Sequence, residues 1–229
     1  MARESHEAKR VRVRKIIALL KRTHPDAKLA LDFSDPLELL VALILAAQAR
    51  DDLVNVVTPN LFRKYRTAAA YAGEKESVLQ KQVSRINFYR QKTRSIQQAC
   101  AMLVKDFGGQ VPEEMDKLLT LPGVARKTAN VVLGTWFCKN EGLVVDTHVT
   151  RVSRRLELTR STDAPKIEQD LMKIIPRERW TLFSHQIIWH GRKLCTARSP
   201  KCVDCPLENL CHAADKTWST VEIHKNATW

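Results

Sequence analysis

Four cysteines near the C-terminal end of the chain are close enough in sequence to bind one metal centre. Cys195, Cys202, Cys205 and Cys211 have the spacing C-x6-C-x2-C-x5-C. Thiolates are soft ligands, and four of them in so short a segment suit either zinc or an iron–sulfur cluster. The spacing therefore predicts a metal site and leaves both kinds of metal open.

A second motif, LPGVARKTANVV, occupies residues 121–132. Pro122 and Gly123 favour a very tight turn between two helices. The second helix would begin with unpaired backbone N–H groups, which together with the helix dipole attract an anion such as a phosphate. Such a contact would hold DNA without sequence preference. The alternative is an ordinary helix–helix turn with no ligand.

The composition favours a helical protein with a polyanionic partner. The chain has 229 residues, only seven of them glycine, and long stretches of good helix formers. Its net charge is +13, from 38 basic and 25 acidic residues. Nucleic acid is the simplest partner for such a charge, although a solvated basic surface would have the same composition.

The N-terminal segment is charged and has no apolar region typical of a signal peptide. The longest apolar run, at 39–47, is far shorter than the roughly 20 residues that span a bilayer. We therefore expect a cytoplasmic protein without a membrane segment, in which clustered cysteines bind metal rather than form disulfides. Cys100 and Cys138 lie outside the cluster, and we expect both to be buried.

The elements that must position these residues are helices. Asp35, Pro36 and Glu38 form a strong start signal for a helix over 36–47, which is apolar almost all round and should be central. Pro59 should break or kink the segment after Asp51. Further helices are expected at 9–24, 66–72, 75–83, 89–105 and 113–119, from the hairpin to about 135, from Asp146 onward, at 163–175, and at 177–190 with its end at Gly191.

Four segments, spread over nearly the whole chain, together resemble the motifs of one protein family in their order and approximate spacing. They are LPGVARKTANVVLG at 121–134, VVDTHVTRV at 144–152, the cysteine array at 195–211 and, more weakly, LILAAQARD at 43–51. The chain resembles the endonuclease III family of helix–hairpin–helix DNA glycosylases. The resemblance implies an all-α, two-lobed fold, with a six-helix barrel lobe at 29–138 and an iron–sulfur cluster lobe formed by 1–28 and 139–229.

The resemblance also implies that the four cysteines hold a [4Fe–4S] cluster. All four irons would then have protein ligands, so we expect the cluster to fix a loop rather than to break bonds. The loop between the first two cysteines carries Arg198 and Lys201. A loop pinned at both ends could present these cations to a DNA phosphate at low entropic cost.

Lys127 matches the lysine that attacks the sugar carbon in bifunctional members of the family. A neutral amine is needed for this attack, which leads to a Schiff base, and burial at a helix start would favour the neutral form. Asp146 matches the family's catalytic aspartate, which stabilises positive charge on the sugar. The alternatives are a solvated or phosphate-binding lysine and an aspartate that only caps a helix.

A glycosylase must also fill the gap left by the extruded base. The resemblance assigns this task to Gln48 and Phe88, whereas an ordinary core aromatic is the alternative for Phe88. Asn87 replaces a usual glycine in this loop and is expected at positive φ. Ala125 replaces a glycine of the hairpin, which is tolerable if its φ is negative. The DNA contacts expected at the hairpin are Leu121, Gly123, Ala125 and Arg126.

The resemblance predicts a monomeric base-excision repair enzyme that acts on double-stranded DNA. Its expected activities are N-glycosylase action on oxidised pyrimidines and AP lyase cleavage by β-elimination. A thymine mismatch glycosylase is an alternative within the same class. A non-catalytic DNA-binding module, with the hairpin as anchor and the metal as staple, is the alternative from a different class.

Overall fold

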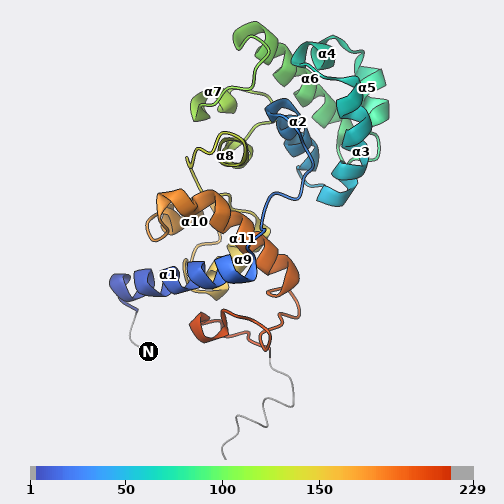
Figure 1. Ribbon diagram of the computed structural model, residues 1–229. Coiled ribbons are helices and arrows are strands. Elements are labelled where there is room, and N and C mark those ends of the chain that lie inside the picture. Colours follow the sequence, from blue (N-terminus) through green and yellow to red (C-terminus); the bar gives the residue numbers. More distant parts are fainter. Residues whose placement is uncertain (1–3, 218–229) are drawn as a thin grey trace, which may run out of the picture. The chain divides into compact units, whose positions relative to one another are not determined.

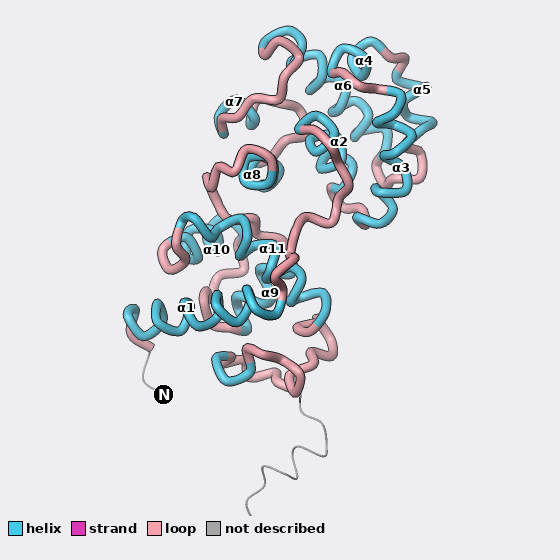
Figure 2. The backbone as a smooth tube through the Cα atoms, viewed as in Figure 1, coloured by secondary structure: helices cyan, strands magenta, loops and turns pink. Residues whose placement is uncertain are grey.

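A computed structural model describes residues 4–217, and within this range it contains helices and no strands (Figures 1 and 2). The all-α prediction is confirmed. The chain divides into two compact units. We call Leu29–Glu141 the hairpin unit, and Met1–Lys28 together with Gly142–Trp229 the cysteine unit.

The hairpin unit is built around α2 (Pro36–Ala46). Asp35 caps this helix, since its side chain accepts a hydrogen bond from Glu38 N at 2.7 Å. Nearly every α2 side chain is buried, and the helix packs against three others. The remaining helices are α3 (Asp51–Lys64), α4 (Ala68–Gly73), α5 (Glu76–Gln82), α6 (Tyr89–Asp106), α7 (Met115–Leu119) and α8 (Arg126–Thr135).

The expected break at Pro59 is absent, because α3 continues through this residue. Proline removes one backbone hydrogen bond from a helix. Buried apolar residues on both sides, including Val54, Val57 and Leu61, anchor the helix to the core before and after the proline. Packing on both sides of Pro59 therefore offsets the tendency of proline to interrupt a helix.

The cysteine unit has a second core. Its helices are α1 (His6–Thr23), α9 (Thr147–Arg155), α10 (Ala164–Met172) and α11 (Trp180–Lys193), with short 3-10 turns at Arg177–Arg179 and Glu208–Leu210. α11 packs against both α1 and α9. The loop that carries the four cysteines follows α11 directly (Figure 1).

Gly191 does not end α11, as the sequence predicted, but lies inside it. A Cβ atom at this position would lie 3.1 Å from both Cβ and Nδ1 of His148, and 3.2 Å from a guanidinium nitrogen of Arg151. The glycine therefore allows α11 to approach α9 closely. A helix stop and a close approach call for the same residue type, so the sequence could not separate them.

Of the two isolated cysteines, Cys100 is buried as predicted, whereas the prediction for Cys138 is wrong. Cys138 is exposed and has φ 55°. It follows α8, where Lys139 N donates a hydrogen bond to Leu133 O at 2.9 Å. This left-handed position after a helix is more often glycine.

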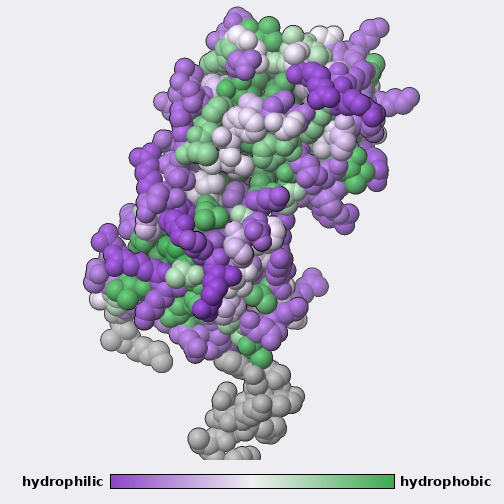
Figure 3. All heavy atoms as spheres, in the orientation of Figure 1, coloured by the Kyte–Doolittle hydropathy of each residue, from purple (hydrophilic) through white to green (hydrophobic). Residues whose placement is uncertain are grey.

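None of the helices within residues 4–217 is long and apolar enough to cross a membrane. Hydrophilic side chains cover much of the visible face of each unit (Figure 3). The C-terminal segment 218–229, with Trp218 and Trp229, lies outside the described residues.

Candidate functional site

The hairpin between α7 and α8 has the tight turn that its sequence predicts. Gly123 adopts φ 82°. A Cβ atom there would lie 2.9 Å from Ser95 Cβ, so both the backbone conformation and the available space require glycine. Leu121 and Val124 are buried on either side of it and anchor the turn to the core. Because its side chain is buried, Leu121 can reach DNA only through its main chain.

α8 begins directly after this turn. Ala125 is the N-cap residue, with φ −94°, so a Cβ atom is tolerated there, as expected. Arg126 and Lys127 occupy the first turn of the helix, and both side chains are exposed. The burial of Lys127 that the sequence suggested is not found in the protein alone. The lysine lies instead at an open helix N-terminus, where backbone N–H groups point outward.

Gln48 and Phe88 share an unusual backbone conformation. Their φ angles are 55° and 58°, in the left-handed region that non-glycine residues rarely adopt. Both are exposed, and Phe88 retains 66% of its surface. The core-aromatic alternative for Phe88 is therefore wrong. The expectation for Asn87 is also wrong, because the left-handed residue of this loop is Phe88, the N-cap of α6.

Lys92, four residues after Phe88, is a lysine at a position where a solvated side chain would be usual. In the structure it is only 6% exposed, and its Nζ donates a hydrogen bond to Leu45 O at 2.8 Å. The sequence spacing indicates this burial, because Lys92 lies at helical intervals from the apolar residues of the buried face of α6. These are Ile96, Ala99 and Leu103.

Asp146 is the N-cap of α9. Its Oδ1 accepts a hydrogen bond from Val149 N at 2.7 Å, and the side chain is half-buried. Asp146 therefore caps α9. A cap does not exclude a catalytic role, because a capping carboxylate keeps its charge and a second oxygen. Asp146 belongs to the cysteine unit, whereas Lys127 belongs to the hairpin unit.

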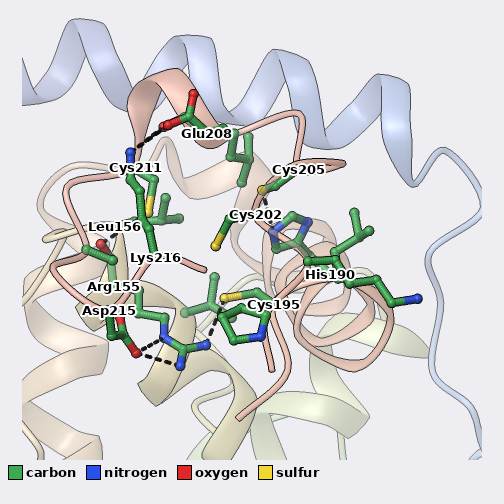
Figure 4. A pocket seen from close by; sticks show the side chains of 16 residues that line it. Arg155, Leu156, His190, Cys195, Cys202, Cys205, Glu208, Cys211, Asp215 and Lys216 are labelled. Carbon is green, nitrogen blue, oxygen red and sulfur yellow. Dashed lines mark hydrogen bonds and ion pairs between the residues drawn. The ribbon is translucent and has the colours of Figure 1, made fainter. Parts of the chain in front are cut away.

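The four cysteines line one pocket (Figure 4). Buried apolar residues, among them Val152, Leu156 and Leu207, form part of its wall. Backbone hydrogen bonds hold the loop that carries the ligands, such as Lys201 N to Leu194 O at 2.9 Å and Cys205 N to Cys202 O at 3.2 Å. These bonds fold the loop so that all four thiols line the same pocket.

The chemistry of this donor set fits an iron–sulfur cluster. Burial, with smaller contributions from the neighbouring Cys195, Cys211 and Cys202, raises the pKa of Cys205 to about 11. Burial likewise raises the pKa of Cys211. Buried thiols that oppose each other's ionisation become thiolates when a cationic metal centre is bound. A [4Fe–4S] cluster with four cysteine ligands supplies this charge and cross-links the loop.

Arginines of α9 brace the first cysteine of the loop. Arg155 donates to Cys195 Sγ at 3.4 Å and to Thr196 O at 2.6 Å, and it pairs with Asp215 at 2.7 Å. Arg151 donates to Cys195 O at 3.0 Å and to Gly191 O at 2.9 Å. The i, i+4 spacing of the two arginines places them on one face of α9, which was the only signal of this role in the sequence.

His190 supports the third cysteine. Its Nε2 lies 3.5 Å from Cys205 Sγ, and its Nδ1 lies 3.4 Å from His24 Nε2. Burial lowers the pKa of His190 to about 4, with a smaller contribution from His24, so the imidazole is neutral at pH 7. No sequence motif pointed to this pair, because 166 residues separate its members.

The loop between the first two cysteines exposes both cations that the sequence predicted to face DNA. Arg198 and Lys201 are exposed, and the loop is closed on itself by a hydrogen bond from Thr196 Oγ1 to Ser199 O at 2.7 Å. Together with the bracing by Arg155, this bond gives the two cations a defined support.

Comparisons with known proteins agree with these features. The chain matches the HhH-GPD superfamily of base excision DNA repair proteins over residues 41–177 and the iron–sulfur binding domain of endonuclease III over 195–211. It is 48% identical to endonuclease III of Synechocystis sp. (90% of this chain, 94% of the relative) and 37% identical to that of Escherichia coli K12 (92% and 98%).

A solved structure of a trapped endonuclease III–DNA covalent intermediate matches with a TM-score of 0.84 and 44% identity, over 89% of this chain and 95% of the other. These matches span almost the whole chain and include both the hairpin and the cysteine array. The chain therefore belongs to the endonuclease III family of the HhH-GPD superfamily, as a DNA-binding base-excision repair glycosylase and AP lyase with a [4Fe–4S] cluster.

Proposed function

We propose that Lys127 is the nucleophile of this enzyme, that Asp146 is its catalytic carboxylate, and that the substrates are oxidised pyrimidines and abasic sites in duplex DNA. The observation that carries the proposal is the position of Lys127. It is exposed in the first turn of α8, directly after a hairpin whose Gly123 has no room for a side chain.

The hairpin supports this role in two ways. The N-terminal N–H groups of α8 attract a phosphate, which would bring the DNA backbone to the helix start. Lys127 lies in the first turn of the same helix, so DNA bound there would place a sugar close to its amine and would remove water from around it.

Lys127 and Asp146 have different roles in the proposed reaction. The neutral Lys127 amine forms a bond to the sugar C1′ as the bond from C1′ to the base breaks, and the base leaves with a proton. The Asp146 carboxylate stabilises positive charge on the sugar. Ring opening gives a Schiff base, loss of a C2′ proton then breaks the C3′–oxygen bond, and water finally releases the lysine.

The same proposal assigns the DNA contacts. Gln48 and Phe88, both exposed, would fill the gap in the stack. Backbone groups of Leu121, Gly123 and Ala125, together with the side chain of Arg126, would hold the phosphates near the lesion. Arg198 and Lys201 would bind the backbone elsewhere, since exposed cations on a supported loop suit phosphates.

We further propose that the protein acts as a monomer in the cytoplasm, on the DNA of the nucleoid. One chain carries both Lys127 and Asp146, so a single copy has the complete catalytic pair. Light scattering of the protein bound to one lesion duplex should give a 1:1 mass, and a 2:1 mass would contradict the monomer.

The test of Lys127 is covalent trapping. The protein is incubated with duplexes that contain thymine glycol, an abasic site or a G·T mismatch, with borohydride present to reduce the Schiff base. We expect trapping and strand cleavage on the first two duplexes. Lys127→Ala should abolish trapping, whereas Lys105→Ala, which removes an exposed lysine from the last turn of α6, should not.

Each other outcome points to an alternative. Excision confined to the G·T duplex would indicate a thymine mismatch glycosylase. Binding without trapping on any duplex would indicate a non-catalytic module. Full trapping by Lys127→Ala would move the nucleophile to another amine.

A further inference from the structure

Lys92 is a buried lysine that meets a helix end rather than a carboxylate. Its side chain comes from the second turn of α6 and reaches the C-terminal turn of α2, where Nζ donates to Leu45 O at 2.8 Å. The residue is 6% exposed, and burial lowers its pKa. Burial of a long cationic side chain is costly, so its position calls for a compensating interaction.

The end of α2 supplies that interaction. α2 has no basic residue in its last turn, and the C-terminus of a helix carries a partial negative charge. Lys92 brings a positive charge to this point from another helix. α2 and α6 pack against each other within the hairpin unit, so the contact belongs to a single core.

Gln48 follows directly after this helix end. Ala47 is the C-cap of α2, and Gln48 then takes φ 55°, a position where helices commonly have glycine. Such a conformation is strained for a non-glycine residue. The hydrogen bonds from Lys92 Nζ to Leu45 O and from Ala49 N to Ala46 O hold the backbone on both sides of this turn.

The main chain of Lys92 is tied to the second exposed residue of the pair. Its backbone N donates to Phe88 O at 3.1 Å, which forms the first hydrogen bond of α6. Phe88 has φ 58° and ψ 27°. Lys92 therefore binds the carbonyl of Phe88 through its main chain and the carbonyl three residues before Gln48 through its side chain.

We propose that Lys92 is a positioning residue that holds Gln48 and Phe88 as a preorganised pair for the gap opened by base extrusion. The inference rests on the gap-filling role proposed above for these two residues. Preorganisation matters because unstacking a base is unfavourable, and mobile loops would add their own ordering cost to it.

The proposal predicts a defect that depends on the form of the DNA. Excision from a duplex requires the gap to be filled, whereas a single-stranded abasic oligonucleotide has no gap. Lys92→Met removes the charge but keeps the length of the side chain. It should lower kcat/KM for thymine glycol excision from duplex DNA by about 10- to 100-fold, because small misplacements are costly in catalysis. Borohydride trapping on the single strand should stay within about 2-fold of wild type, since Lys127 is untouched.

Gln97→Met is the matched control. Gln97 lies on the same helix, and its Nε2 donates to two carbonyls near the end of α4, Glu74 O at 2.6 Å and Tyr71 O at 3.4 Å. Gln97→Met also removes a hydrogen bond from a side chain to a backbone carbonyl, but it leaves both exposed loops untouched. Excision and trapping should therefore both remain at wild-type levels. Lys92→Arg, which keeps a cation at the end of α2, should recover most of the duplex activity.

A second readout follows the gap directly. A 2-aminopurine placed next to the lesion brightens when its neighbour leaves the stack, and this rise on binding should shrink in Lys92→Met. Lys92→Gln provides a milder change should the methionine variant not fold, and the same duplex-selective loss is expected. Adding either change to a Gln48→Ala/Phe88→Ala protein should have little further effect on excision.

Wild-type excision by Lys92→Met would overturn the proposal, as would equal losses on duplex and single strand, which indicate general damage to the fold. Failure of the proposed function has a different signature. In that case wild-type protein would not trap on either DNA, or Lys127→Ala would still trap.

Discussion

Asp146 is the N-cap of α9 and, in our proposal, also the carboxylate that acts on the sugar. Asparagine caps helices about as well as aspartate does, but it is neutral. Asp146→Asn should therefore keep the thermal midpoint of unfolding and lose on the order of 100-fold in single-turnover excision. Asp146→Ala should lose activity and, in addition, about 1 kcal/mol of stability. Wild-type excision rates in Asp146→Asn would leave Asp146 with the cap alone.

His185 gives the protein a dependence of stability on pH. Burial lowers its pKa from the ordinary value of 6.5, so the folded state keeps it neutral. Above pH 6.5 both states are neutral and stability is complete. As the pH falls below 6.5, the unfolded chain binds a proton that the folded state refuses, and the free energy of unfolding decreases by up to about 1.4 kcal/mol per pH unit.

Thermal unfolding midpoints between pH 5 and 7.5 test this dependence. The decrease should be shallower in His185→Leu than in wild type, and a residual slope should remain because burial also lowers the pKa of His24 and of His190. His6→Ala, a change at an exposed histidine, should retain the wild-type slope. Identical slopes in His185→Leu and wild type would contradict the assignment.

At the scale of elements, the sequence predicted what local chemistry determines. Asp35 and Asp146 cap their helices as expected, and the hairpin glycine stands at positive φ. The uninterrupted helix at Pro59 and the buried position of Lys92 have a common physical origin. A proline tolerated in a helix and a lysine aimed inward both depend on partners that pack from elsewhere in the chain. The residue type at one position does not reveal which distant residues will pack against it, so these partners could not be predicted from the sequence.

Gly191 offers a test at the same scale. Alanine is a better helix former than glycine by about 1 kcal/mol, so propensity alone predicts that Gly191→Ala is stabilising. Its Cβ would instead press on His148 at 3.1 Å. We expect a net loss of about 1–3 kcal/mol, from overpacking between α9 and α11.

Urea unfolding midpoints measure the effect, and iron content reports whether the braced cysteine loop is disturbed as well. Gly73→Ala is the control, because a Cβ at the end of α4 meets nothing within 4 Å. It should be neutral or slightly stabilising. If Gly191→Ala stabilised the protein to the same degree, the close approach of α9 and α11 would not be limiting.

At the scale of the whole molecule, the net charge of +13 bears on how DNA is held. Only cations that displace counterions from phosphates contribute to the salt dependence of binding, at a slope of about 0.9 per contact.

Arg198 and Lys201 project from a loop braced by Arg155 and closed by the cysteine ligands. The double variant Arg198→Ala/Lys201→Ala should therefore flatten the plot of log Kd against log salt for undamaged duplex by about 2. Lys81→Ala/Lys105→Ala removes the same charge from exposed sites and should leave the slope unchanged. Equal flattening by both double variants would mean that the DNA senses the overall charge rather than the loop.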